Sequence, residues 1–147
     1  MSEIAALNAV RRVPAPINET IRQYAPGSPE RAELKARLAS MANERVEIPL
    51  IIGGREIRTG KTQQSIMPFK HKHVLADYHM AEPKHVQMAI TAALAARREW
   101  ASWAFEDRAA VLLKAAELLA TSQRATLNAA TMLGQAKVVF QAEIDAA

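Results

Sequence analysis

The sequence of 147 residues is long enough for about one domain, and half of its residues are hydrophobic while only 5% are aromatic. It contains no cysteine, which excludes disulfides, thiolate zinc sites and a cysteine nucleophile within these residues. The net charge of +4 is modest, and basic residues are interspersed with acidic ones. We therefore expect a solvated surface, no nucleic-acid partner and, since no apolar run approaches ~18 residues, no membrane span.

The first segment, residues 1–27, is predicted to form an extended N-terminal arm. Pro14, Pro16 and Pro26 interrupt regular structure there, and only a short helix is expected, around Asn18 to Gln23. The arm is expected to lie along the rest of the protein rather than to fold alone.

Residues 28–80 are predicted to combine one helix with short β-strands. Ser28 is a good N-cap residue and Pro29 suits the first helical position, so a surface helix is expected from Pro29 to about Asn43. The run from Glu47 to Arg58 reads EIPLIIGGREIR, in which two β-prone runs flank a glycine pair. That pair favours a tight hairpin turn.

Further strands are expected on both sides of a turn. Pro49 cannot donate a ladder hydrogen bond, so the first strand of the hairpin is expected to begin there or to lie at an edge. After a polar loop over Gly60 to Gln64, a second strand pair is expected at Gln64–Met67 and Lys72–His79.

Residues 81–147 are predicted to be helical. Two amphipathic helices, from Glu82-Pro83 to about Ala101 and from about Phe105 to Thr121, carry apolar residues at the spacing of one helix face. They are expected to be the centre of the fold, around which the rest of the chain packs. Each needs a partner surface, so the segment standing alone is expected to expose apolar side chains.

Two shorter helices are expected after them. One covers about Gln123 to Leu133, and Gly134 is the expected stop. The other begins at Val138 and has no stop signal before Ala147. The sequence is therefore expected to have been cut from a longer chain in mid-helix.

No metal site is predicted. His71, His73, His79 and His85 lie close together in the sequence, and two histidines at i and i+2 of a strand point the same way. No carboxylate or thiolate at a suitable spacing completes a zinc site. Solvated turn residues are the favoured interpretation.

Other candidate motifs have plain structural interpretations. Gly53-Gly54 lacks the further glycine and the following helix of a dinucleotide fingerprint, and the stretch from Gly134 to Lys137 does not match a P-loop. Trp100 and Trp103 could form a binding platform, but tryptophans near the end of an amphipathic helix are expected in the core.

Two carboxylates lie on the last predicted helix, at Glu143 and Asp145. Paired carboxylates can perform acid–base chemistry. At i and i+2 of a helix, however, they face apart, so a role without acid–base chemistry is favoured.

Seven segments follow one another along the chain: GSPER (Gly27–Arg31), IP (Ile48–Pro49), PF followed by HKH (Pro68–His73), AALAARREW (Ala92–Trp100), DRAAVLLKAAELL (Asp107–Leu119), TMLGQAK (Thr131–Lys137) and QAEIDAA (Gln141–Ala147). Together they resemble the N-terminal part of the Δ1-pyrroline-5-carboxylate dehydrogenase branch of the aldehyde dehydrogenase superfamily. The resemblance covers about residues 18–147, and its specificity comes from the whole series rather than from any single segment.

The resemblance implies an α/β fold of the aldehyde dehydrogenase type, in which these residues supply a β-hairpin, short strands and an α-helical layer of the NAD-binding domain. It implies oxidation of L-glutamate γ-semialdehyde, the opened form of pyrroline-5-carboxylate, to L-glutamate. A cysteine thiolate would attack the aldehyde, hydride would pass to NAD, and the thioester would be hydrolysed. The catalytic and NAD-binding residues are expected downstream, so none is assigned within this sequence.

The resemblance also bears on one residue of the last helix. The family's glutamate that helps to line the aldehyde entrance would fall two residues beyond Ala147. Asp145 lies one turn earlier on the same helix face. Asp145 is therefore expected to lie beside the substrate tunnel.

The expected partners are the remainder of the same polypeptide, the aldehyde substrate and other copies in a homo-oligomer. The start of the sequence has an acidic Glu3 and no apolar segment, so it is a poor secretory signal. A cytoplasmic location is expected, or the mitochondrial matrix for a eukaryotic protein. The competing interpretation is a small stand-alone helical module that binds an acidic partner.

Overall fold

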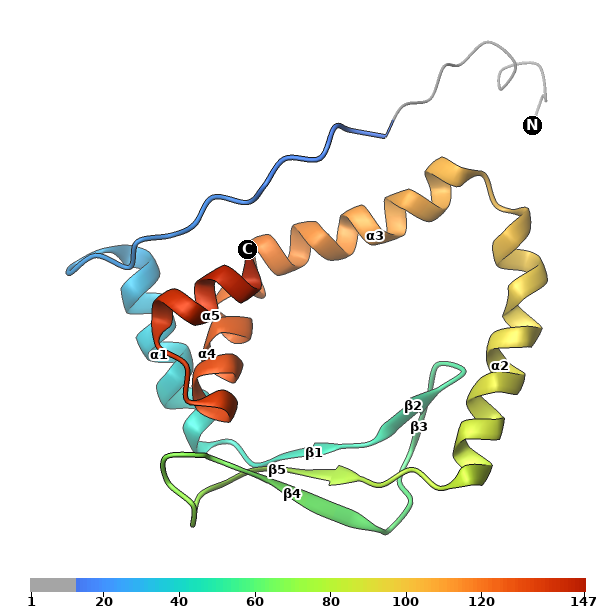
Figure 1. Cartoon of the computed structure of the whole chain (residues 1–147), viewed down its shortest axis with the longest axis horizontal. Coiled ribbons are helices and arrows are strands. Elements are labelled where there is room, and N and C mark those ends of the chain that lie inside the picture. The colour runs from blue at the N-terminus through green and yellow to red at the C-terminus, as the bar shows by residue number, and fades with distance from the viewer. Residues whose placement is uncertain (1–12) are drawn as a thin grey trace.

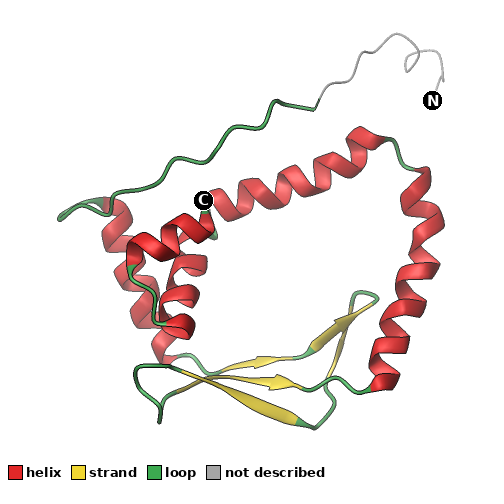
Figure 2. Cartoon of the chain, in the orientation of Figure 1, coloured by secondary structure: helices red, strands yellow, loops and turns green. Residues whose placement is uncertain are grey.

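The computed structural model of the protein describes residues 13–147. Figure 1 shows the described elements around an open frame, with α1, α4 and α5 gathered at one side and α2 at the other. Figure 2 shows that the strands gather at one end of this frame. The helices are α1 (Pro29–Asn43), α2 (Pro83–Ser102), α3 (Phe105–Ala120), α4 (Arg124–Gln135) and α5 (Val139–Ala146), and the strands are β1 (Val46–Ile48), β2 (Leu50–Ile52), β3 (Arg55–Ile57), β4 (Thr62–Ile66) and β5 (Val74–His79).

The strands form a three-stranded mixed sheet and a separate hairpin. In the sheet, β5 lies between β1, which runs parallel to it, and β4, which runs antiparallel. β2 and β3 pair around Gly53 and Gly54, whose φ angles are 57° and 75°. Positive φ at both positions is what a two-residue hairpin turn requires. The predicted hairpin and the predicted second strand pair are confirmed.

Pro49 divides the strand that was predicted to precede the hairpin turn. Its missing N–H interrupts the ladder, and separate strands lie on either side of it. The first, β1, pairs with β5 so that Val46 lies opposite Ala76. The second, β2, pairs among the described strands with β3 alone. The chain therefore passes from the sheet to the hairpin at this proline.

The second strand pair differs from the prediction at its boundaries. β4 begins inside the loop predicted at residues 60–64, because Gln63 pairs with Tyr78 across the ladder. The Tyr78 hydroxyl also donates a hydrogen bond to Gln63 Oε1, at 2.9 Å. β5 begins two residues later than predicted, because the His73 carbonyl belongs to the turn and accepts from the Met67 N–H at 3.0 Å.

Three of the predicted helices begin and end close to the expected residues. α1 has the predicted N-cap, since the Ser28 side chain accepts a hydrogen bond from the Arg31 N–H at 3.4 Å. α2 begins at Pro83, and the preceding Glu82 forms a capping box with His85. α3 follows after a break of two residues. Local capping chemistry thus contributes to the starts of α1 and α2.

The predicted stop at Gly134 is wrong. α4 continues through this glycine to Gln135, and the residue that turns into the left-handed region is Ala136, with a φ of 57°. Leu133 is buried just before the glycine, so packing of the last turn holds the helix together past the local signal. Beyond the turn, the Val138 N–H donates a hydrogen bond to Gln141 Oε1 at 3.1 Å, at the start of α5.

The short helix predicted around Asn18 to Gln23 is also wrong, because the arm is extended there. Its backbone groups bind other segments instead of each other. The Arg22 N–H donates to Glu143 Oε1 at 2.7 Å, and the Thr20 carbonyl accepts from Arg124 Nη2 at 3.2 Å. Tertiary hydrogen bonds thus replace helical ones. The part of the predicted arm at residues 1–12 lies outside the described residues.

The centre of the fold is not the pair of long helices that the periodicity favoured. α3 buries no residue and α2 buries only His85, whereas α4 supplies Ala129 to a core that it shares with Tyr24 and Leu34. α2 and α3 do have apolar faces, but these faces are exposed to solvent in the described residues. Leu94 on α2, for example, is 60% exposed. Periodicity identifies a buried-type face but not the segment that covers it.

The two tryptophans predicted in the core are half exposed instead. Trp100 and Trp103 retain 41% and 43% of their surface, and their rings pack on each other with centroids 5.4 Å apart. They belong to the uncovered face formed by the end of α2 and the start of α3. Within residues 13–147, no helix is both long and apolar enough to cross a membrane.

Candidate functional site

The most completely built polar site surrounds Glu143 on α5. This glutamate has no exposed surface, and neither does Asn128 on α4, while Arg124 keeps only 1%. Tyr24 from the arm is buried beside them. Three segments that are far apart in the sequence therefore meet at one carboxylate.

Each oxygen of the Glu143 carboxylate accepts hydrogen bonds from more than one donor. Oε1 accepts from the Arg22 N–H at 2.7 Å and from Arg124 Nη2 at 2.6 Å. Oε2 accepts from the Tyr24 hydroxyl at 2.8 Å, from Asn128 Nδ2 at 2.7 Å and from Arg124 Nε at 3.2 Å. The guanidinium thus binds both oxygens, in the bidentate geometry of a strong charge-assisted pair.

The electrostatics of this cluster favour the charged carboxylate. Burial from water would raise the pKa of Glu143, but hydrogen bonds from Arg124, the Arg22 backbone, Asn128 and Tyr24 outweigh it and lower the pKa to about 2. The same contact raises the pKa of Arg124. Burial, followed by the hydrogen bond to Glu143, raises the pKa of Tyr24. The ion pair is therefore fully charged at neutral pH.

Such a cluster can hold segments together but cannot exchange protons near neutral pH. Both Glu143 oxygens are occupied, and a carboxylate with a pKa of about 2 is a poor general base at pH 7. Within the described residues, the Asn128 side-chain oxygen is the one buried atom of this cluster without a partner. The complete burial of Glu143 was not foreseen from the sequence.

Sequence reasoning missed the cluster because its members are scattered. A weak signal was available: Arg124 and Asn128 are four residues apart and so share one face of α4, among buried alanines. An arginine and an asparagine on an apolar face require a buried acceptor. The acceptor, Glu143, could not be chosen from the other carboxylates without the tertiary structure.

Asp145 lies on the opposite side of α5 from Glu143. Two residues correspond to a rotation of about 200° around a helix, and the Asp145 side chain is 45% exposed while Glu143 is buried. The prediction that these two carboxylates face apart is confirmed. Asp145 forms an ion pair with Lys137, which lies in the turn between α4 and α5.

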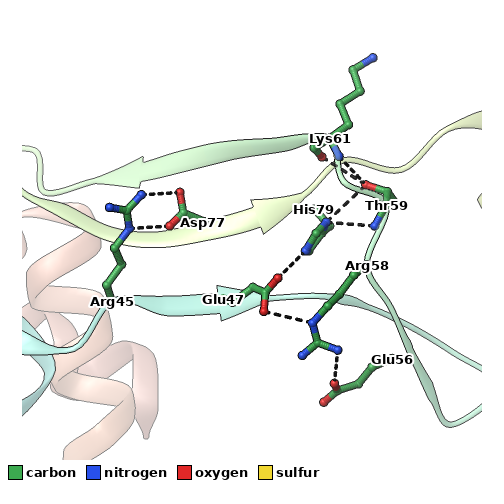
Figure 3. Close-up of polar contacts among 8 residues, drawn as sticks. All are labelled: Arg45, Glu47, Glu56, Arg58, Thr59, Lys61, Asp77 and His79. Carbon is green, nitrogen blue, oxygen red and sulfur yellow. Dashed lines mark hydrogen bonds and ion pairs between the residues drawn. The ribbon is translucent and has the colours of Figure 1, made fainter.

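A second polar cluster joins the sheet to the hairpin (Figure 3). The Thr59 N–H donates to His79 Nδ1 at 3.0 Å, so the proton of the neutral ring lies on Nε2, which donates to Glu47 Oε1 at 2.9 Å. Arg58 Nε donates to the other Glu47 oxygen at 3.0 Å. The hydrogen bonds from His79 and then Arg58 lower the pKa of Glu47. This cluster ties the β3–β4 loop to β5.

Two further histidines, His73 and His85, also have structural partners. His73 Nε2 lies 2.7 Å from the Ala42 carbonyl, and His85 Nδ1 accepts from the Glu82 N–H at 3.0 Å. In the part of the chain that the structure describes, no group of three or more histidine, cysteine, aspartate or glutamate side chains could hold a metal ion.

A groove of about 780 Å³ separates the hairpin from α2, but it does not contain either polar cluster. It is lined by apolar and polar side chains of both elements, among them Arg55, Lys84 and Met88. Its lining carboxylate and amine are engaged in exposed ion pairs, Glu56 with Arg58 and Lys84 with Glu82. We therefore keep the Glu143 cluster as the candidate site, because it is the one where buried charge converges.

Comparison with known proteins adds the following matches. The sequence profile of the aldehyde dehydrogenase family matches residues 56–147. A curated relative from Dictyostelium discoideum, named mitochondrial delta-1-pyrroline-5-carboxylate dehydrogenase, is 42% identical over 147 residues, which is 100% of this chain and 26% of that protein. One from Agaricus bisporus, named delta-1-pyrroline-5-carboxylate dehydrogenase, is 46% identical over 140 residues, covering 95% of this chain and 26% of its own length.

The same similarity extends to solved structures. The delta-pyrroline-5-carboxylate dehydrogenase from Mycobacterium tuberculosis, crystallised with bound NAD, matches with a TM-score of 0.91 and 42% identity over 95% of this chain and 26% of that one. The Thermus thermophilus 1-pyrroline-5-carboxylate dehydrogenase matches with a TM-score of 0.84 and 28% identity. The chain thus spans about 26% of the length of the relatives that it matches.

Proposed function

The chain belongs to the aldehyde dehydrogenase family, and from that premise we propose that it forms the N-terminal part of a longer NAD-dependent dehydrogenase. The proposed enzyme oxidises L-glutamate γ-semialdehyde, the opened form of pyrroline-5-carboxylate, to L-glutamate in proline degradation. The observation that carries the proposal is identity along nearly the whole chain. Relatives named for this activity are 42–46% identical over 92–100% of it.

In this proposal the 147 residues supply structure rather than reactive groups. They contain no cysteine, so the attacking thiolate would come from another part of the longer polypeptide. Gly53-Gly54 turns a hairpin between two strands, and no helix follows it to receive the phosphates of a dinucleotide. NAD binding is therefore assigned to residues outside this sequence, and none of the described side chains is given a role in hydride transfer.

The other assignments follow the same premise. We propose the division into an arm at residues 1–27, a helix with short strands at 28–80 and a helical part of the NAD-binding domain at 81–147. The partners would be the remainder of the polypeptide and further copies in a homo-oligomer, with no nucleic acid or membrane. Several relatives are named as mitochondrial, which supports the matrix for a eukaryotic source and leaves the cytoplasm for a bacterial one.

Turnover by the complete gene product tests the proposed function. The reading frame that contains codons 1–147 is expressed in full, and NADH formation is followed with pyrroline-5-carboxylate as substrate. We expect turnover by the complete product and none by the 147-residue chain alone. A frame that stops after codon 147 would contradict the proposal and favour the small helical module that binds an acidic partner. Turnover by the short chain would contradict the assignment of the reactive groups to another part of the polypeptide.

Within the proposed enzyme, Asp145 lies beside the entrance for the aldehyde. Its exposed side chain, paired with Lys137, would face a substrate that carries an α-ammonium as well as an α-carboxylate. A negative charge there attracts the ammonium before the aldehyde reaches the thiolate. Because the side chain is exposed, the contribution is at most about 1 kcal/mol.

Replacing Asp145 with asparagine in the complete protein is expected to raise KM for the aldehyde about twofold to fivefold and to leave kcat unchanged. The difference should shrink at high salt, because exposed charges are screened. Lys137→Met removes the cation that neutralises Asp145, and we expect it to lower KM. Equal KM values for wild type and Asp145→Asn at low salt would exclude this placement of Asp145.

A further inference from the structure

Helix α5 is held by both apolar and polar contacts. Ala142 is fully buried, and Val139 packs against the core formed by Tyr24, Leu34 and Ala129. Glu143 is the buried polar residue of the helix. Its hydrogen bonds add directional contacts to this apolar packing.

The donors around Glu143 restrict both the position and the rotation of α5. They approach from the arm, through the Arg22 N–H and the Tyr24 hydroxyl, and from α4, through Arg124 and Asn128. Apolar residues of the same volume would often be as stable as such a buried pair. What the hydrogen bonds add is direction, since each has a preferred angle and length.

We propose that Glu143 is a positioning residue that fixes the rotation of α5 and thereby the placement of Asp145 at the aldehyde entrance. This inference rests on the proposed function. Glu143 does not touch the substrate; it acts through the helix that carries Asp145. The aldehyde class concerned is one with a charged amino-acid group at its far end, because only such a substrate would respond to the placement of a carboxylate.

A small rotation of α5 would displace the Asp145 carboxylate by a distance that affects substrate recognition. Side chains reach about 5–6 Å from a helix axis, so a rotation of α5 by about 20° would move the Asp145 carboxylate by about 2 Å. Errors of about 1 Å in a recognition group already reduce enzymatic efficiency.

The backbone conformation of the arm places the Tyr24 hydroxyl, which is the donor, next to Glu143. Tyr24 has a φ of 50°, a left-handed conformation that is uncommon for a residue other than glycine. Such conformations are strained and persist only where the surroundings impose them. Here Arg31 Nη1 donates to the Tyr24 carbonyl at 3.1 Å while the tyrosine hydroxyl reaches Glu143. The arm, through Arg22 and Tyr24, thus helps to fix the position of Glu143.

A double-mutant cycle in the complete protein tests the proposal. Glu143→Gln keeps the shape of the side chain but removes its charge, and we expect it to raise KM for the aldehyde by no more than Asp145→Asn does, with kcat unchanged. If Glu143 acts through Asp145, the double variant should have the KM of Asp145→Asn alone, within about twofold. A merely structural role would give effects that multiply.

Tyr24→Phe and Glu117→Gln complete the design. Tyr24→Phe removes one hydrogen bond to Glu143 without leaving a charge unpaired, so it should fold and shift KM in the same direction by a smaller factor. Glu117 is exposed on α3 and pairs with Lys114, so Glu117→Gln is the matched control and should change nothing. Multiplying effects, or no KM shift in either Glu143→Gln or Tyr24→Phe, would overturn the inference.

Two outcomes distinguish a failure of the positioning role from a failure of the proposed function. If Asp145→Asn shifts KM but the Glu143 and Tyr24 variants do not, the proposed function survives and the positioning role falls. If Asp145→Asn is silent while Glu143→Gln shifts KM, the route through Asp145 is excluded, although the complete product can still turn over the aldehyde.

Discussion

Replacing Arg124 with methionine is expected to lower the free energy of unfolding by about 3–5 kcal/mol. The substitution leaves the Glu143 carboxylate buried with no exposed surface and without its bidentate counter-ion. The remaining donors, from Arg22, Asn128 and Tyr24, satisfy the oxygens but not the full charge. Urea denaturation followed by far-ultraviolet circular dichroism measures the change.

The control removes both charges at once. In the double variant Arg124→Met, Glu143→Leu, no unpaired ion stays buried, and most of the lost stability should return even though the ion pair is gone. Lys114→Met on α3 breaks an exposed pair with Glu117 and should cost less than about 1 kcal/mol. A loss near that small value for Arg124→Met would mean that water reaches the Glu143 carboxylate.

Local signals in the sequence were sufficient for most secondary structure. Ser28 and Pro29 predicted the start of α1, and the glycine pair at 53–54 predicted the hairpin turn, because each acts on its immediate neighbours. The fold class and the family resemblance were confirmed as well. The parallel pairing of β1 with β5 was not foreseen, since Val46 and Ala76 lie 30 positions apart in the chain.

The failures share one physical cause, which is tertiary packing. Gly134 is a good stop signal in isolation, yet burial of Leu133 keeps α4 helical past it. Leu94 and Leu112 mark apolar faces correctly, yet at 60% and 69% exposure they are not in the core of these residues. Periodicity indicates that a helix face can be buried. Tertiary contacts decide which segment covers that face.

The candidate site was the least predictable feature for the same reason. Glu143 binds Arg124 on the preceding helix and Tyr24 in an arm 119 positions earlier. No short motif contains these residues. Asp145, by contrast, was singled out through the family resemblance alone, and its role remains a prediction that rests on the proposed function.

Lowering the pH should remove the contribution of Glu143 to stability. Its folded-state pKa of about 2 lies below the ordinary value of 4.5, so the stabilisation is fully present above pH 4.5 and is lost as the pH falls through that value toward 2. A difference of this size corresponds to about 3 kcal/mol. We therefore expect wild type to lose about 3 kcal/mol more than Glu143→Gln across this interval.

The comparison of two pH profiles isolates this group from the others. Asp77 and Glu82 also have lowered pKa values, because Arg45 and Lys84 respectively donate hydrogen bonds to them, but they titrate in both proteins and cancel in the difference. Glu117→Gln, at an exposed carboxylate of α3, serves as the control and should give a profile close to that of wild type. Parallel profiles for wild type and Glu143→Gln would show that Glu143 titrates normally in the folded protein. The convergence of five hydrogen bonds on its carboxylate would then have no energetic consequence, and α5 would have to be held by contacts other than these.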